Sequence, residues 1–402
     1  MKSKDDILII TSYFPPETGA ASNRIFALSE QLKHHKYKVK VLSPLPNYPY
    51  GKVFGAYRNK FKVNEIYKQI PVTRLFIFAS KSNNKFIRLF SILSYAISLF
   101  FYLLITKTPQ KQIIQCSPLF VGFFAVLAGR LRGKTLILNV SDLWPLAGLE
   151  MGILSKGLYY RILEYIEGFI YKHSDRIIGQ SEEILTHVKK TIKTSTKPLF
   201  LYRNFPQFNL PKSSVEVAQD EIKFVYAGLL GIAQGIEEIC KQVNFPENSS
   251  FHIYGDGPKA DEVKAIVKNH KRIFYHGSLS RNELHKTLMP YDVTIIPLKN
   301  RIYGSVPSKI FEYSKLGLPI LFFSDGEGAD VVEQLGLGIA QREIDYKQLE
   351  RNIKQIVQQE INLPTKAEVL AISKQAFNLE TQFKAFEQSC LNYTESTIKQ
   401  DK

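Results

Sequence analysis

The chain lacks the features of proteins that are held together by disulfides or metal clusters. It has only three cysteines in 402 residues, Cys116, Cys240 and Cys390, and they are odd in number and far apart. That pattern argues against a disulfide framework and is typical of a reducing compartment. Low-complexity tracts and clear short repeats are also missing, which indicates an ordinary globular protein. No secretory signal is visible, because the first residues are polar and the apolar run after them is only as long as a strand.

Acidic residues are scarce in the first half of the chain. Through Arg203 there are 30 Lys and Arg against 12 Asp and Glu, a net +18, whereas the remainder has 23 against 25, a net −2. A one-sided basic field predicts a polyanionic surface, either nucleic acid or anionic lipid. No helix-turn-helix, zinc-finger or RNA-binding signature accompanies the charge, so we expect no nucleic-acid partner.

One long apolar run, residues 89–105, contains no charge and is rich in aromatic residues. It is slightly short of the roughly 20 residues that a membrane-spanning helix needs. Three alternatives stay open: a buried crossover helix, a helix inserted in a membrane surface, and a transmembrane span. Leu103 and Leu104 would contact lipid if their face inserts, and would be core if the helix is a crossover. We expect peripheral attachment to an anionic membrane surface.

Short β-rich runs alternate with helical patterns along the whole chain, which is typical of βαβ units and parallel sheets. Strands are expected at residues 7–12, 39–43, 72–78, 113–117, 136–140, 176–180 and 199–202, and then at 222–227, 251–254, 273–276, 293–298 and 320–323. An amphipathic helix is expected at 159–173. Polar residues 206–220 resemble a linker between the two series.

The predicted fold is therefore α/β, with two Rossmann-like doubly wound domains, residues 1–205 and 206–375, facing a cleft. Ligands bind such sheets beyond the carboxyl ends of the strands. A last helical pattern, about 374–393, follows the second series, and we expect the segment 376–402 to pack back on the first domain.

The stretch TSYFPPETGAASNR follows the first predicted strand. Pro15 and Pro16 end the strand, and helical spacing then begins near residues 19–22. A helix N-terminus among small residues offers free N–H groups to an anion. An ordinary βα turn that binds nothing is the alternative.

Glycine-rich turns follow the strands of the second series: YAGLLGIAQGIEE contains Gly228, Gly231 and Gly235, and YGDGP contains Gly255. The spacing is not the dinucleotide fingerprint. The strongest cluster is PLKNRIYGSVPSKIFEYSKLGLPIL, in which Pro307 starts a helix whose first turn has Ser308, Lys309 and Glu312. A carboxylate there suits ribose hydroxyls and a lysine suits a diphosphate. A capped helix with a solvated salt bridge is the alternative.

These motifs in this order resemble glycosyltransferase family 4, retaining enzymes of the GT-B fold, over nearly the whole chain. The chain is most similar to the subgroup that builds O-antigen and capsule repeats, including N-acetyl-L-fucosamine (fucosamine) transferases. The shared motifs are PNYPYGKVF, SPLFVG, DLWP and VPSKIFEY.

The resemblance implies a nucleotide-sugar site. Gly19 matches the glycine that approaches the donor diphosphate, and Glu312 matches the second, ribose-binding glutamate of the family's pair. The first glutamate would fall at Gly304 and is missing, which suits a deoxy or N-acetylated sugar. Gln234 stands near a missing lysine, so Lys309 and Arg301 are expected to take over the phosphate charge. The expected binding set is Gly19, Gly228, Gly231, Gln234, Gly255, Ser305, Val306, Ser308, Lys309 and Glu312.

Asp142 follows a predicted buried strand, where a carboxylate could orient or deprotonate an acceptor hydroxyl. An N-cap over Trp144 is an equal alternative. The expected catalytic residues are Asp142, Lys309 and Glu17, with Asn23 and Glu182 as lesser candidates.

No DxD pair and no His/Cys cluster occurs, so we expect no metal and no cofactor beyond the nucleotide-sugar co-substrate, with UDP as the expected nucleotide. The expected function is sugar transfer, of a residue such as N-acetyl-fucosamine, to a polyprenyl-diphosphate-linked acceptor at the cytoplasmic face of a bacterial membrane, beside other polysaccharide-assembly enzymes. Two alternatives stay open: a nucleotide-sugar epimerase of the same fold, and a non-catalytic GT-B scaffold.

Overall fold

The computed structural model describes residues 4–82, 84–193, 197–211 and 221–392. The chain divides into two compact units. Unit 1 comprises Met1–Arg203 with Glu380–Lys402, and unit 2 comprises Asn204–Leu379. The boundaries expected from the sequence were 205/206 and 375/376. Most of the expected linker, residues 212–220, lies outside the described residues.

The sheet of unit 1 has eight strands among the described residues, in the order β3-β4-β2-β1-β5-β6-β7-β8. Every strand pairs in parallel except β3, which runs antiparallel to β4. The strands are β1 (Asp6–Ile10), β2 (Lys38–Pro44), β3 (Lys62–Tyr67), β4 (Ile70–Leu75), β5 (Lys111–Gln115), β6 (Thr135–Val140), β7 (Arg176–Gly179) and β8 (Leu199–Leu201).

The hairpin β3–β4 corrects the sequence prediction, which placed one strand at 72–78 and none at 62–67. Strand β3 lies at the edge of the sheet and none of its residues is fully buried, so its hydrophobic signal is weak. Its turn uses Lys68 and Gln69, both at positive φ. The usual sequence signal for such a turn is Asn-Gly or Asp-Gly.

The helices of unit 1 fit the predicted alternation. Helix α5 confirms the amphipathic prediction, and α1 begins at Ala20, directly after Gly19 at φ 146°. The helices are α1 (Ala20–His34), α2 (Lys85–Ile105), α3 (Leu119–Leu131), α4 (Leu146–Glu150), α5 (Leu158–His173) and α6 (Glu182–Ile192), with a 3₁₀ turn at Gly55–Tyr57.

Helix α2 is the apolar run, and its two faces differ. The face toward the core buries Tyr95, Ala96, Leu99 and Leu103. The opposite face exposes large apolar side chains at helical spacing: Phe86, Phe90, Ile97, Phe101 and Ile105. By length and composition this is the one described helix that could cross a membrane, and only 22% of its most apolar window is buried. Leu103 is therefore core, and the exposed face is a different set of residues.

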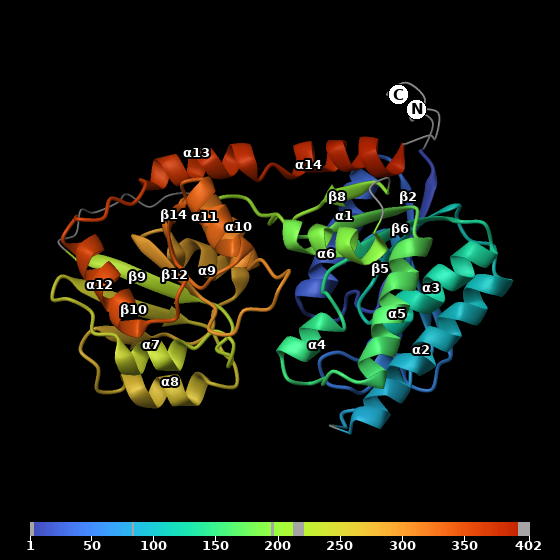
Figure 1. Cartoon of the computed structure of the whole chain (residues 1–402), viewed down its shortest axis with the longest axis horizontal. Helices are drawn as coiled ribbons and strands as arrows, with labels where there is room; N and C mark the ends of the chain where they lie inside the picture. The colour runs from blue at the N-terminus through green and yellow to red at the C-terminus, as the bar shows by residue number, and fades with distance from the viewer. Residues whose placement is uncertain (1–3, 83, 194–196, 212–220, 393–402) are drawn as a thin grey trace. The chain divides into compact units, whose positions relative to one another are not determined.

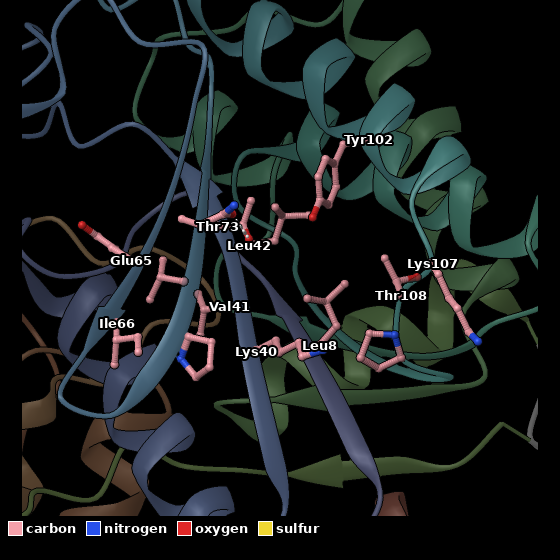
Figure 2. Close-up of a pocket in the computed structure, with 14 residues that line it drawn as sticks. Leu8, Lys40, Val41, Leu42, Glu65, Ile66, Thr73, Tyr102, Lys107 and Thr108 are labelled. Carbon is pink, nitrogen blue, oxygen red and sulfur yellow. Dashed lines mark hydrogen bonds between the residues drawn. The ribbon is translucent and has the colours of Figure 1, made fainter.

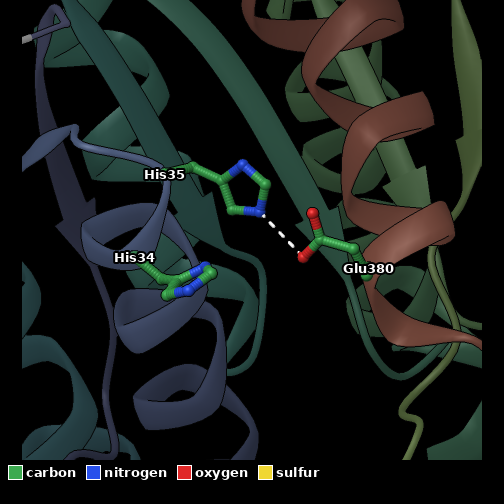
Figure 3. Close-up of side chains that lie close together, drawn as sticks. All are labelled: His34, His35 and Glu380. Carbon is green, nitrogen blue, oxygen red and sulfur yellow. Dashed lines mark hydrogen bonds and ion pairs between the residues drawn. The ribbon is translucent and has the colours of Figure 1, made fainter.

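The C-terminal helical pattern is two helices, not one. Helix α13 (Lys366–Ala376) ends before Phe377, and α14 (Leu379–Phe386) continues into a π turn at Glu387–Leu391. Phe383 and Phe386 join the core of unit 1. His35, at the end of α1, stacks on Phe383 and lies 3.1 Å from Glu380, nitrogen to oxygen (Figure 3).

The sheet of unit 2 has six described strands in the order β11-β10-β9-β12-β13-β14, all parallel. They are β9 (Ile222–Ala227), β10 (Ser249–Tyr254), β11 (Ile273–Tyr275), β12 (Val293–Pro297), β13 (Ile320–Phe323) and β14 (Gly338–Gln341). The helices are α7 (Ile236–Gln242), α8 (Ala260–Val267), α9 (Arg281–Leu288), α10 (Ser308–Lys315), α11 (Glu327–Gln334), α12 (Tyr346–Val357) and α13.

Helices cover both faces of this sheet (Figure 1). Phe224 and Tyr226 pack in one core with α7, α8 and α12, whereas Val225 and Ala227 pack in the other with α10 and α11. The alternation along β9 places successive side chains on opposite faces. The predicted doubly wound α/β class is confirmed.

Candidate functional site

The strand order of unit 2 reverses between β9 and β12. Connections leave these two carboxyl ends toward opposite faces, which opens a crevice where doubly wound sheets bind ligands. Gly228 directly follows β9, and residues 298–307 lead from β12 into α10. The predicted binding residues of the second half of the chain come from these loops, from the loop after β10, and from α10.

Two predicted glycines are adjacent at the carboxyl ends of β9 and β10. The Gly228 N–H donates to the Tyr254 carbonyl at 2.9 Å. Gly255 has φ 136°, and a Cβ there would lie 1.8 Å from the Gly228 carbonyl oxygen, so only glycine fits. Beside them is a hollow of about 310 Å³, lined by Gly228, Leu229, Tyr254, Gly255, Asp256, Ser278, Leu279 and Leu284.

Lys309 reaches from the first turn of α10 to the end of β9. Its Nζ donates to the Ala227 carbonyl and lies 4.6 Å from the centroid of the Tyr226 ring. A Cβ at Gly228 would collide with this Nζ, so the ammonium lies directly beneath the Gly228 turn. Burial lowers the pKa of Lys309 to about 8, against the attraction of the Glu312 carboxylate.

Glu312 is held by two basic residues of α9. Its Oε1 accepts from His285 Nε2 at 2.7 Å and from Arg281 Nε at 3.2 Å. The second oxygen, Oε2, has no hydrogen-bond partner recorded among the described residues. Burial raises the pKa of Glu312, but the hydrogen bond from His285 and the charge of Arg281 outweigh it, so the pKa lies below its ordinary value. The carboxylate is charged and fixed, with one oxygen available.

The loop before α10 brings Ser305, Val306 and Ser308 to its N-terminus, with Ser305 and Ser308 exposed. Pro307 is the N-cap residue rather than the first helical residue, and it gives the first-turn N–H groups no side-chain partner. Arg301, expected to share the phosphate charge, lies 3.9 Å from Asp325, nitrogen to oxygen.

Gly231 and Gln234 lie in the turn between β9 and α7. The Gln234 N–H donates to the Gly231 carbonyl at 3.2 Å. Gln234 Oε1 is buried without a hydrogen-bond partner among the described residues. Gln234 therefore supports this turn and supplies no positive charge.

In unit 1, Asp142 is exposed and lies two residues beyond the end of β6. It is not an N-cap, because α4 begins at Leu146 with Pro145 as its N-cap residue. Its neighbour Tyr13 has a raised pKa, first from burial and then from the charges of Glu17 and Asp142. Asp142 is thus an accessible carboxylate at the carboxyl edge of the sheet.

Glu17 has a different position from the one expected of a catalytic group. It is 3% exposed and its carboxylate accepts from the backbone N–H groups of Asn47, at 2.7 Å, and Tyr48, at 2.9 Å. Burial raises its pKa against these bonds. This arrangement assigns Glu17 to holding the loop beside Gly19, rather than to proton transfer. Of the lesser candidates, Asn23 and Glu182 are both exposed at helix starts.

Among the described residues, His34, His35 and Glu380 could together hold a metal ion, with ligand atoms within 4.8 Å of one another (Figure 3). Glu380 is also 3.4 Å from Lys384, which disfavours a cation. This group shares no residue with the predicted site. The expectation of a metal-independent site stays a prediction.

Unit 1 also has a hollow, of about 420 Å³. It lies against β1, β2 and β4 beside the end of α2 (Figure 2). Leu8, Lys40, Leu42 and Tyr102 are among its lining residues, together with Lys107. None of the predicted site residues lines it.

Sequence reasoning missed His285 and Arg281, which fix Glu312, and Arg24, which reaches the ends of β6 and β7. No local motif marks them. His285 and Arg281 do lie four residues apart on the amphipathic helix that follows HGSLS, which is a weak signal of a common face.

The comparisons with known proteins agree with the fold described above. Residues 223–359, within unit 2, match the profile of the family described as glycosyl transferases group 1. No curated protein matches the sequence.

Solved structures match almost the entire chain at low sequence identity. A sucrose-phosphate synthase from Thermosynechococcus elongatus has a TM-score of 0.67 at 13% identity, covering 99% of this chain and 98% of the other. The lipopolysaccharide outer core galactosyltransferase WaaB has a TM-score of 0.65 at 15% identity, and the match covers 94% of this chain and 98% of WaaB. Anabaena Alr3699/HepE, in complex with UDP and glucose, has a TM-score of 0.64 at 12% identity, and the match covers 95% of this chain and 98% of HepE.

The shared fold and the family match support a glycosyltransferase of the GT-B fold, and with it transferase activity. This confirms the expected enzyme class. The assignments to family 4 and to the fucosamine subgroup stay predictions.

Proposed function

We propose that the protein is a retaining glycosyltransferase that moves a sugar from a UDP-sugar to a polyprenyl-diphosphate-linked acceptor in bacterial capsule or O-antigen synthesis. The observation that carries the proposal is the placement of two residues of α10, Lys309 in its first turn and Glu312 just after that turn. Lys309 lies beneath Gly228, and Glu312 is fixed with one free oxygen, both at the switch point of unit 2.

Each part of the donor has a matching group. The hollow between Gly228 and Ser278 suits a planar base. Glu312 Oε2 suits the ribose hydroxyls, and Lys309 with the first-turn N–H groups of α10 suits the diphosphate. The neighbour HepE binds UDP and UDP-glucose, which supports UDP as the nucleotide.

The donor sugar is proposed from a missing group. Gly304 stands where the resembled family has a glutamate that contacts sugar hydroxyls. An uncharged position there suits a deoxy or N-acetylated sugar, such as N-acetyl-fucosamine, which presents fewer hydroxyls.

In the proposed reaction the glycosidic bond to the nucleotide breaks as negative charge develops on the leaving diphosphate. Lys309 and the α10 N–H groups stabilise that charge without a metal. Asp142 is exposed at the carboxyl edge of the other sheet, and we assign it to orienting the acceptor hydroxyl. The departing phosphate is itself a base that can take the hydroxyl proton.

The membrane proposal is supported by unit 1. The exposed face of α2 presents Phe86, Phe90 and Phe101, and the first half of the chain has a net charge of +18. Lys85 Nζ donates to the Ile153 carbonyl at 3.3 Å, so the start of α2 lies beside a loop with further exposed apolar side chains. Apolar insertion and attraction to anionic lipid together support the proposal that the enzyme binds the cytoplasmic face of the membrane.

The test is a thermal-shift and calorimetric panel of UDP, GDP, ADP and their sugar conjugates, with EDTA present. A ligand at 100 times its dissociation constant stabilises the fold by about 2.7 kcal/mol, so binding is detectable without the acceptor. Selective stabilisation by UDP conjugates is the expected result. Silence from a folded sample would favour the scaffold alternative, and turnover of a UDP-sugar without acceptor would favour the epimerase.

A further inference from the structure

Arg24 is a guanidinium at the carboxyl edge of the unit 1 sheet, and no carboxylate of the described residues lies within ion-pair distance of it. It extends from α1 and donates from Nη1 to Gln180 Oε1 and from Nη2 to Ser141 Oγ, both at 2.6 Å. Its Nε is buried without a partner in the described part of the chain. Both bonds are to neutral groups, so nothing in direct contact neutralises the charge.

The contact between Arg24 and Gln180 leaves one buried donor unsatisfied on each side chain among the described residues. A guanidinium can only donate, so Oε1 of Gln180 must face it, and the Gln180 amide nitrogen is left buried and unpartnered. Unsatisfied buried donors on two side chains that contact each other at the end of β7 indicate an absent ligand rich in oxygen.

The charge of Arg24 persists at neutral pH. Burial lowers the pKa of Arg24 to about 10, against the attraction of Asp142. Asp142 acts on Arg24 without contacting it, since no ion pair within 4.0 Å joins them. A buried cation without a direct counter-ion is costly to a fold, and such a cost is retained where a ligand relieves it.

We propose that Arg24, with Gln180, binds an anionic oxygen group of the acceptor substrate, a phosphate or a carboxylate, beside the hydroxyl that Asp142 orients. The inference rests on the proposed function and names a recognition element for its acceptor. Arg24 fixes the acceptor by its charge, and Asp142 then faces the neutral reacting part of the same molecule. Two sources have this chemistry: the diphosphate of a lipid carrier and a uronate of the acceptor sugar.

The test uses two probes, inorganic pyrophosphate and glucuronate, titrated calorimetrically into the full chain with the donor site saturated by UDP. We expect one probe to bind and Arg24→Gln to weaken it about 10- to 100-fold, the range for a lost charge-assisted hydrogen bond. Arg24→Lys should retain part of the binding. The exposed Arg58→Gln removes the same charge elsewhere in unit 1 and should change nothing.

Gln180→Glu keeps the shape of the side chain and supplies the missing counter-ion. We expect this variant to raise the melting temperature and to abolish anion binding, so the test survives an Arg24→Gln variant that fails to fold. Binding of pyrophosphate identifies a phosphate, and binding of glucuronate a carboxylate. Equal anion affinity in wild type and Gln180→Glu would overturn the proposal, as would no binding of either probe to wild type.

Failure of the proposed function would appear in the UDP titration, independently of the anion titrations. If UDP does not bind, the same titrations are run without it, and Lys309→Met accounts for pyrophosphate bound at the donor site.

Discussion

Replacing Lys309 by methionine should stabilise the free protein while removing its response to nucleotide. The ordinary lysine pKa is 10.5, and burial lowers that of Lys309 to about 8 in the folded chain. The unfolded chain therefore holds this proton more tightly between pH 8 and 10.5. The wild-type free energy of unfolding contains a penalty from Lys309 that is complete below pH 8 and vanishes as the pH rises to 10.5.

The size of this penalty follows from the pKa difference. Each pKa unit corresponds to about 1.4 kcal/mol, so the difference between a pKa of 10.5 and one of about 8 gives about 3.5 kcal/mol. Methionine has a similar length and no charge, and the Ala227 carbonyl keeps its hydrogen bond from the Tyr313 hydroxyl. The loss of the contact with the Tyr226 ring reduces the gain by about 1 kcal/mol.

Chemical denaturation followed by circular dichroism, at pH values from 7 to 10.5, measures both variants. The difference between the free energies of unfolding of wild type and Lys309→Met cancels the contributions of the other groups that titrate in this range. We expect the advantage of Lys309→Met to shrink by about 3 kcal/mol across the window, and UDP to stabilise wild type only. A pH-independent difference, or a variant that still responds to UDP, would refute the assignment.

Further outcomes are expected from the same site and from α2. Glu312→Gln should weaken UDP binding by about 1.5–3 kcal/mol, because one oxygen of a charged acceptor is lost, and the exposed Glu360→Gln should leave the calorimetric affinity unchanged. The double variant Phe90→Asp and Phe101→Asp should no longer sediment with anionic vesicles. The control Ile66→Asp, at an exposed apolar residue of β3, should still sediment with them. Equal sedimentation of the two variants would contradict the assigned membrane face. EDTA should leave the thermal shift produced by UDP unchanged, and its loss on chelation would require a metal in the site.

Much of the fold could be predicted from local patterns. The parallel strands and amphipathic helices follow from apolar periodicity, which depends only on neighbouring residues. Helix α10 was predicted for the same reason, because Lys309 and Glu312 lie three positions apart on it; the expected place of Glu312 in the first turn was wrong, since the helix begins at Ser308 and Glu312 is its fifth residue. Hairpin β3–β4 was missed because an edge strand buries little, so its pattern is not selected for hydrophobicity.

The burial or exposure of the predicted residues could not be predicted from the sequence. The sequence contains Glu17 and Asp142 as two carboxylates near strand ends, and nothing local separates them. Folding buries Glu17 against the backbone of a loop 30 residues later, and leaves Asp142 exposed. Likewise residues 99–105 of α2 are all apolar or aromatic in sequence, and only packing decides that Leu103 is core while Phe101 is exposed.

The sequence by itself determined the α/β class, the glycine turns and the basic first half, because each of these is a property of short segments or of composition. The tertiary structure decided which charges meet. It brought His285 and Arg281 of α9 to Glu312 of α10, and Arg24 of α1 to Gln180 after β7. These pairs join segments far apart in the chain, and their energies depend on burial and distance, which exist only once the sheet has formed.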